Sequence, residues 1–113
     1  MKKEYRILKG YEFQEIIDNK RFVVNDSFVV YYRRKKEDHS RIGISVGKKL
    51  GKATDRNKIK RQVRMMFQQL LDYPLNNDMI CIVRAGYLQH TFKENKKLLE
   101  NLVFKVNIIG DET

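Results

Sequence analysis

Cysteine is almost absent from this chain, because Cys81 is the only one among 113 residues. A single cysteine forms no disulfide framework and no cysteine-based zinc site, so disulfide-stapled domains and zinc-binding folds are excluded. Cys81 lies inside the apolar run 79–83. We therefore expect it to be a small buried side chain in a protein of a reducing compartment.

Long apolar runs are missing as well. None approaches the roughly 18 residues from which a membrane-spanning helix is built. The basic N-terminal residues 1–6 are not followed by the apolar stretch of a signal peptide. The sequence therefore predicts a cytoplasmic protein that neither spans a membrane nor is secreted.

The sequence also lacks a recognisable set of catalytic or metal-binding side chains. Acid pairs occur at 37–38, in a charged stretch, and at 111–112, near the C-terminus, and neither pair suits a two-metal site at a strand end. The two histidines, His39 and His90, are expected in solvent. We predict no catalytic residue, no metal site and no cofactor bound by the protein itself, so another molecule would supply any chemistry.

Positive charge is what the chain has in abundance. Its 24 Lys and Arg residues outnumber 14 Asp and Glu residues, which gives a formal net charge of +10 and a sequence pI of about 9.8. A small domain with this balance usually binds polyanions, nucleic acid more often than an anionic membrane surface. A domain whose charge serves solubility alone is the alternative.

Hydrophobic periodicity predicts helices alternating with strands. Helices are expected over 11–20, 55–71 and from Thr91 onward, and strands over 21–32 (one, or two with a break at 25–27), 41–47 and 79–85. Thr54 or Asp55 would cap the second helix, and Thr91 with Glu94 would form a capping box for the third.

The order of these elements, αβββαβα, indicates the α+β class. We predict a single domain over 1–113, an α-β sandwich in which a small, mainly antiparallel sheet packs against three helices. Residues 1–9 are predicted to form a loose basic arm and residues 107–113 a polar tail.

The strand predicted over 41–47 has an unusually bare face, on which Gly43, Ser45 and Gly47 alternate with apolar residues. Glycine in a strand marks the close approach of a backbone or a ligand, so either a ligand or a tightly packed helix could lie there. Aromatic residues are frequent in the preceding segment, 13–32. At least half of them are expected in the core, and the others could form a platform for single-stranded nucleotides.

The positive charge is concentrated in residues 48–64, which carry eight basic side chains and one acid, and so +7 of the net +10. Arg56, Lys60 and Arg64 follow one another at intervals of four, with Asn57 and Arg61 in a parallel row. Like charges at this spacing destabilise a helix by about 0.2–0.5 kcal/mol per pair. We interpret the segment as a ridge of cations, beside the apolar face of a helix, that binds phosphates. A merely solvated helix face is the alternative.

Two adjoining segments resemble the signature of the bacterial ribonuclease P protein family. The first is Ser-Val-Gly-Lys-Lys-Leu-Gly-Lys-Ala at 45–53, and the second is Arg-Asn-Lys-Ile-Lys-Arg-Gln-Val-Arg at 56–64, which is similar to the family's Arg-Asn-Arg motif. The similarity extends over the N-terminal arm, the Phe13 helix and the strand at 28–31, and spans the chain to about residue 105.

This resemblance implies a protein subunit that binds a large catalytic RNA and the 5′ leader of precursor tRNA, and that assists the endonucleolytic removal of the leader. In the family the RNA carries the active site and uses the magnesium ions, and neither a membrane nor a further protein partner is required. The resemblance also implies a ribosomal-protein-like fold with a left-handed βαβ crossover.

The resemblance assigns residues to two RNA-binding surfaces. The catalytic RNA would be bound by Arg56, Asn57, Lys58, Lys60, Arg61 and Arg64 of the signature, with Lys48 and Lys49 of its lead-in. The leader would lie in a cleft between the first helix and the open sheet face, formed by Phe13, Ile17, Val29, Tyr31 and Ser45.

Two positions depart from the family pattern. Lys58 replaces the third signature arginine, which keeps the charge but loses the guanidinium fork. Ile17 stands where the family often has Phe, which leaves apolar contact there but puts stacking in question. Other functions share the charge pattern: a structural RNA-binding module with no part in leader removal, or a self-sufficient nuclease, against which the missing acid cluster argues.

Overall fold

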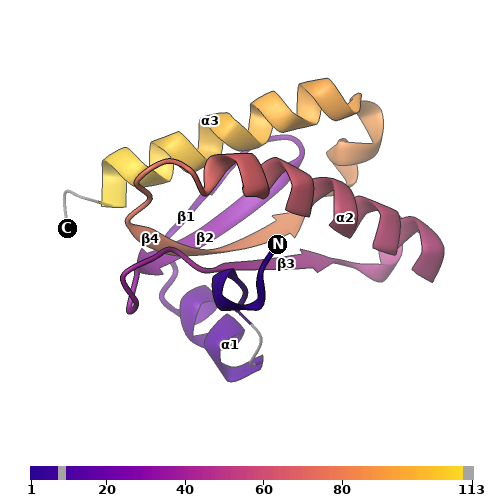
Figure 1. The fold of residues 1–113 in the computed structure, drawn as a ribbon. Coiled ribbons are helices and arrows are strands. Elements are labelled where there is room, and N and C mark those ends of the chain that lie inside the picture. Colours follow the sequence, from indigo (N-terminus) through magenta and orange to yellow (C-terminus); the bar gives the residue numbers. More distant parts are fainter. Residues whose placement is uncertain (8–9, 111–113) are drawn as a thin grey trace.

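The computed structural model describes residues 1–7 and 10–110, and its elements follow the predicted order (Figure 1). They are α1 (Gly10–Asp18), β1 (Phe22–Val24), β2 (Phe28–Arg34), β3 (Ile42–Val46), α2 (Ala53–Leu70), β4 (Asn77–Val83) and α3 (Phe92–Gly110). Short 3-10 helices add η1 (Lys3–Tyr5), η2 (Lys48–Leu50) and η3 (Ala85–Gln89). The stretch 21–32 therefore holds two strands rather than one.

The strands form a mixed sheet in the order β1-β2-β4-β3. β1 and β4 each pair antiparallel with β2, whereas β3 lies parallel to β4. The parallel pair is connected through α2, and this β3-α2-β4 crossover is left-handed (Figure 1). About 98% of such connections are right-handed, so only the family resemblance, and no periodicity, predicted this feature.

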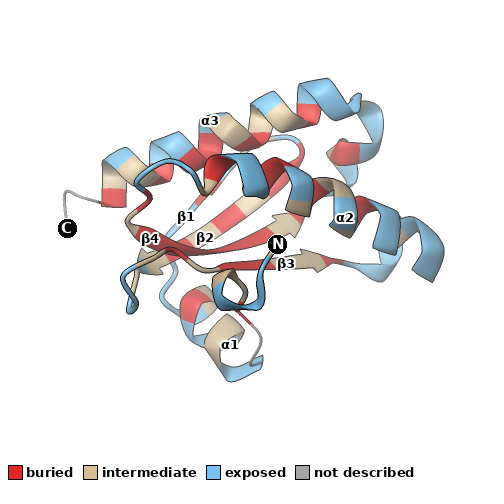
Figure 2. Ribbon diagram, viewed as in Figure 1, coloured by how far each residue is buried: buried red, intermediate tan, exposed pale blue. Residues whose placement is uncertain are grey.

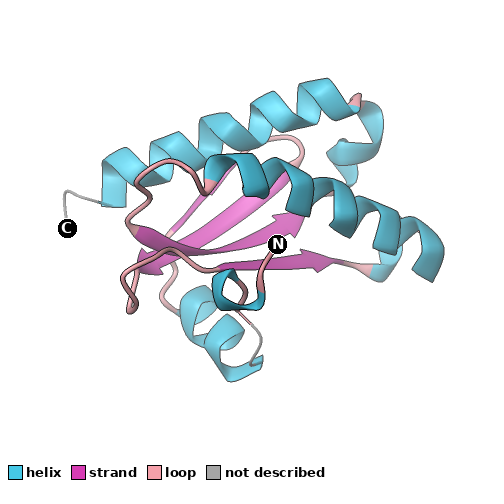
Figure 3. Ribbon diagram, in the orientation of Figure 1, coloured by secondary structure: helices cyan, strands magenta, loops and turns pink. Residues whose placement is uncertain are grey.

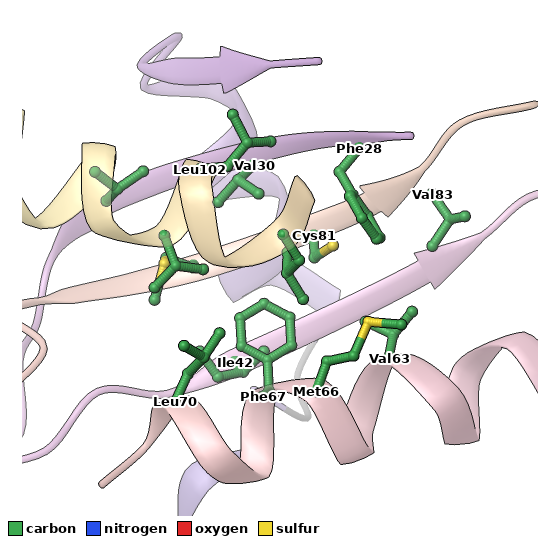
Figure 4. Close-up of a cluster of buried hydrophobic side chains, with 14 of the residues drawn as sticks. Phe28, Val30, Ile42, Val63, Met66, Phe67, Leu70, Cys81, Val83 and Leu102 are labelled. Atoms are coloured by element: carbon green, nitrogen blue, oxygen red, sulfur yellow. The ribbon is translucent and has the colours of Figure 1, made fainter. Parts of the chain in front are cut away.

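The main hydrophobic core lies between one face of the sheet and the helices α2 and α3 (Figures 2 and 4). α2 contributes its predicted apolar stripe, Ile59, Val63, Met66, Phe67 and Leu70. The stripe packs on alternate strand residues such as Phe28 and Cys81. The predicted burial of Cys81 is confirmed, and this burial raises the pKa of its thiol, so the side chain stays protonated.

α1 covers part of the opposite face of the sheet (Figure 3). Ile16 is fully buried there, and Phe13 packs against the bare backbone of Gly43. A Cβ at Gly43 would lie 2.6 Å from Phe13 Cζ and 2.6 Å from Ile80 Cδ1. At this position the bare face therefore accommodates a tightly packed helix, the second of the two alternatives.

The terminal segments are packed more closely than predicted. Ile7 is buried beside Ile16, and its N–H donates to the Ile42 carbonyl at 3.0 Å. The prediction of a loose arm over 1–9 is therefore wrong for residues 1–7, and residues 8 and 9 lie outside the described part of the chain. The predicted polar tail, 107–113, is wrong for 107–110, because α3 continues to the buried Gly110; residues 111–113 also lie outside.

The N-terminal caps of α2 and α3 were also predicted from the sequence, and one of the two predictions is correct. The N-cap of α2 is Lys52, so neither Thr54 nor Asp55 caps it, although the Asp55 carboxylate accepts the N–H of Lys52 at 3.1 Å. The capping box of α3 is confirmed, since Thr91 and Glu94 exchange hydrogen bonds of 2.8 and 3.2 Å.

The histidines are half-buried rather than free in solvent. His39 Nε2 lies 2.7 Å from the Glu4 carbonyl oxygen, which raises the pKa of His39. His90 Nε2 lies 2.7 Å from Asp26 Oδ2. Each ring therefore ties two distant parts of the chain together: His39 holds the N-terminal segment, and His90 holds the turn between β1 and β2.

An ion network anchors α1 to the sheet. Arg41 Nη2 lies 2.5 Å from Glu12 Oε2 of α1 and 3.5 Å from Oδ2 of the fully buried Asp78. Arg33 lies between the same acids, 3.6 Å from Glu12 and 3.8 Å from Asp78. Because all four side chains are at least 85% buried, solvent screens these contacts less than it screens a surface pair.

The ion network predicts an acid-sensitive contribution to stability. The hydrogen bond from Arg41 lowers the pKa of Glu12 from its ordinary value of 4.5. A lowered folded-state pKa gives stabilisation that is complete above the unfolded-state pKa and is lost as pH falls through the folded-state pKa. We expect Glu12→Gln to reduce the free energy of unfolding at pH 7 by about 1–3 kcal/mol, and the difference from the unaltered chain to narrow below pH 4.5. Urea unfolding measured from pH 7 to pH 3 checks this.

The matched control is Glu37→Gln in the exposed loop, which should leave the free energy of unfolding at pH 7 nearly unchanged, because surface substitutions of this kind have small effects. A Glu12→Gln difference that stays constant as the pH falls would show that the Glu12 carboxylate is not the titrating group.

Candidate RNA interface

The basic segment folds as η2 and the first turns of α2, and Lys60, Arg61 and Arg64 lie on a side of α2 away from its buried stripe. Asn57 and Arg61 are exposed, and Lys60 and Arg64 are partly exposed. Together with Thr54 these residues line a groove of about 470 Å³ that contains no acid. We call it the cation groove. The structure thus brings together four of the predicted residues as a continuous positive surface.

The other predicted basic residues lie around this groove. Lys58 is exposed on the flank of α2 next to η3, where it lines a separate depression with Tyr87. Lys48 and Lys49 are exposed on η2, just before α2 begins. Arg56 is only partly exposed and its Nε is buried, so it lies toward the packing side of the helix rather than on the ridge.

The second candidate surface is the part of the sheet that α1 leaves uncovered. Across this face the strand register aligns Val24, Val29, Ile82 and Ser45 in one row, and Phe22, Tyr31, Ile80 and Gly43 in the next. Phe13 and Ile17 of α1 border the face and pack against its buried centre. All five residues that the resemblance assigned to the leader therefore lie on one surface.

Some residues of this surface are not among those that the resemblance assigned to the leader. Phe22 and Val24 are about half exposed, at 50% and 47%, and the Phe22 ring lies 5.2 Å from the Tyr31 ring. Ile82 is partly exposed beside them. Phe22 and Val24 lie on the same face of β1 because successive side chains of a strand alternate between its two faces. A strand of three residues is too short for these faces to be assigned from the sequence alone.

The two surfaces lie on opposite sides of the sheet. α2 carries the cation groove on one side, whereas the apolar rows lie on the other side, next to α1 (Figures 1 and 3). One surface offers guanidinium, ammonium and amide donors, which suit phosphates. The other offers aromatic and aliphatic faces, on which unpaired bases can stack. Such an arrangement can hold two RNA segments at once.

Neither surface contains a catalytic constellation. Within the described residues, no group of three or more His, Cys, Asp or Glu side chains could hold a metal ion. Tyr87, which lies outside both surfaces, has a pKa raised to about 12 by burial, and it donates to Gln62 Oε1 at 2.7 Å. It is therefore a structural hydrogen-bond donor. No helix among the residues that the structure describes is long and apolar enough to cross a membrane.

An α+β domain with a cation groove along one helix and an apolar-aromatic sheet face on the other side has the features of an RNA-binding protein. Its family is shown by comparison with known proteins: the ribonuclease P family model matches residues 1–107. The chain belongs to the ribonuclease P protein family. It is accordingly a non-catalytic protein subunit of an endoribonuclease whose partner is the ribonuclease P RNA.

Individual relatives support this assignment over nearly the whole chain. The ribonuclease P protein component of Mesoplasma florum is 47% identical over 107 residues, covering 93% of this chain and 97% of the relative. The Staphylococcus aureus RNase P protein has a solved structure with 43% identity and a TM-score of 0.81, covering 90% and 94% of the two chains. The Thermotoga maritima protein gives 34% identity and a TM-score of 0.77, with 87% and 94% covered.

Proposed function

We propose that the chain binds the ribonuclease P RNA through α2 and η2 and binds the 5′ leader of precursor tRNA across the open sheet face. The RNA carries the chemistry and the magnesium ions, and the protein holds no cofactor of its own. The observation that carries this proposal is the placement of two chemically different surfaces on opposite sides of one sheet. The complex would act in the cytoplasm without a membrane or a further protein partner.

The assignment of each RNA to its surface follows from chemistry. A folded RNA presents closely spaced phosphates, which favour the row of Asn57, Lys60, Arg61 and Arg64 and the nearby Lys48 and Lys49. A leader is single-stranded and can unstack its bases onto Tyr31 and Phe22. Arg56 and Lys58 would contribute charge at the margins of the cation groove.

The function is tested by adding the purified chain to a ribonuclease P RNA at low magnesium concentration and measuring precursor-tRNA cleavage. Cleavage should be stimulated, and the complex should bind precursor tRNA more tightly than mature tRNA, which has no 5′ leader. Absence of stimulation contradicts the proposal. Equal binding of mature and precursor tRNA would favour a structural RNA-binding module, and cleavage by the chain with metal alone would favour a nuclease.

Tyr31→Ala is predicted to separate the two surfaces. Its ring lies on the open face, far from the cation groove in the fold, so leader-dependent binding should weaken by about 1–3 kcal/mol, the usual contribution of one base–aromatic contact. Affinity for the ribonuclease P RNA alone should stay within a factor of about two. Binding of precursor tRNAs with and without a leader to the assembled complex measures the difference.

Tyr73→Ala is the matched control, because Tyr73 is 55% exposed and packs against Phe104 of α3 instead of the open face. It should leave leader-dependent binding unchanged. If the Tyr31 and Tyr73 variants behaved alike, the open face would not be the leader site.

A further inference from the structure

A second groove continues along α2 beyond the cation groove. It has a volume of about 490 Å³ and is lined by Met1, Arg61, Arg64, Met65, Gln68 and Gln69. Arg61 and Arg64 line both grooves. At a rise of about 1.5 Å per residue, the surface from Arg61 to Gln69 spans about 12 Å of the helix, of which about 7.5 Å lies beyond Arg64. We call this surface the glutamine groove.

The glutamine groove differs in chemistry from the cation groove. Beyond the shared arginines its side chains are uncharged: two amides and two thioethers, the latter from Met1 and Met65. Met65 is 61% exposed, and Gln68 and Gln69 are exposed. Among the described residues, neither glutamine side chain makes a hydrogen bond to the protein. Two amides with unused donors and acceptors therefore lie next to two guanidinium groups and an apolar surface.

We propose that the glutamine groove binds an unpaired nucleobase of the RNA whose phosphates contact Arg61 and Arg64. An amide can donate and accept on one base edge at once, which a lysine or arginine cannot. The Met65 side chain and a guanidinium plane supply the surface on which the base lies. The inference rests on the proposed function, since it extends the α2 contact with the ribonuclease P RNA from phosphates to a base.

The size and composition of the groove favour RNA over a protein partner. Met65 is the one exposed large hydrophobic side chain of α2, a helix that is described in full. A stable protein interface buries about 800 Å² on each partner around an apolar centre. A single base needs only one flat apolar contact and a hydrogen-bonding edge, and its phosphates account for the two arginines.

The test is the double variant Gln68→Ala/Gln69→Ala of the full chain, bound to a ribonuclease P RNA over a range of salt concentrations. Affinity should fall about five- to thirtyfold, as expected for the loss of two hydrogen bonds. The slope of log affinity against log salt should stay unchanged, because no phosphate contact is lost. Base-specific chemical probing should show an unpaired base that the unaltered chain protects and the variant does not, while backbone protection persists.

Asn101→Ala is the matched control, because it removes an exposed amide from α3. It should change neither affinity nor base protection. Alanine favours helix more than glutamine does, so the double variant should unfold at the same temperature as the unaltered chain or above it.

The outcomes separate this inference from the proposed function. If affinity and base protection are unchanged in the double variant, the inference is wrong but the proposed function still stands. The glutamine groove would then bind a partner other than RNA. A shallower salt slope also overturns it, because the glutamines would then only support phosphate contacts. Failure of the unaltered chain to bind the RNA overturns the proposed function and the inference with it.

Discussion

Replacing Arg61 and Arg64 together by alanine is expected to lower the affinity for the ribonuclease P RNA about a hundredfold, since each charge-assisted hydrogen bond contributes about 1.5–3 kcal/mol and such losses are not fully additive. Both side chains line the cation groove, and both also line the glutamine groove. The loss should therefore exceed that of any other pair on α2. Each lost phosphate contact should also reduce the salt slope by about one unit.

The loss of two positive charges would by itself lower the affinity for RNA, so the control must remove the same charge at another place on the protein. Lys93 and Lys97 are exposed one turn apart on α3, outside both grooves. Their double alanine variant has the same net charge as the arginine variant and should lose only a small part of the affinity. If both variants lost affinity equally, the basic helix would act through the overall field of the protein and not through local contacts.

The cation groove was predictable because helical periodicity is local. Residues 53–70 contain both the apolar stripe and the basic row, so their spacing alone placed Arg61 and Arg64 beside the packing face. The family resemblance added only the identity of the RNA that this surface is expected to bind. The same locality explains why the capping box at Thr91 and Glu94 could be recognised, since its partners are three residues apart.

The open sheet face was less predictable because it is made by pairing distant strands. Val29 and Ser45 both lie beside Ile82, a neighbour relation that depends on the order β1-β2-β4-β3. The ion network has the same character, because Glu12, Arg41 and Asp78 share no local pattern. Long-range pairing of this kind cannot be deduced from the spacing of residues along the chain.

The N-terminal arm shows how composition can mislead. Residues 1–6 are mostly polar and basic, which is typical of a loose segment, but the apolar Ile7 that follows has a specific place against Ile16 and Ile80. Its N–H is also paired with Ile42. The buried Ile7 side chain, its backbone bond to Ile42 and the contact of His39 with the Glu4 carbonyl together hold a short segment that its average composition would leave free.

Phe67→Ala is expected to be the most damaging single substitution for stability. The Phe67 ring is fully buried between α2, the sheet and α3 (Figure 4). Replacing a buried phenylalanine by alanine destabilises a protein by about 3–5 kcal/mol, through lost apolar burial and the cavity left behind. Domains of this size have a free energy of unfolding of about 5–15 kcal/mol, so the variant should fold marginally. Urea unfolding followed by circular dichroism measures the change.

The matched substitution is Phe104→Ala, since Phe104 is 37% exposed on α3 and contacts Tyr73 at the surface. Phe104→Ala should reduce the free energy of unfolding clearly less than Phe67→Ala does. Part of the Phe104 ring is already in water, and its removal leaves no enclosed cavity. Phe67 touches neither the cation groove nor the glutamine groove. RNA affinity of the Phe67 variant, corrected for its folded fraction, should therefore equal that of the unaltered chain. If RNA affinity were still reduced after this correction, core packing would set the positions of Arg61 and Arg64. The RNA-binding geometry of α2 would then depend on the core beneath the helix.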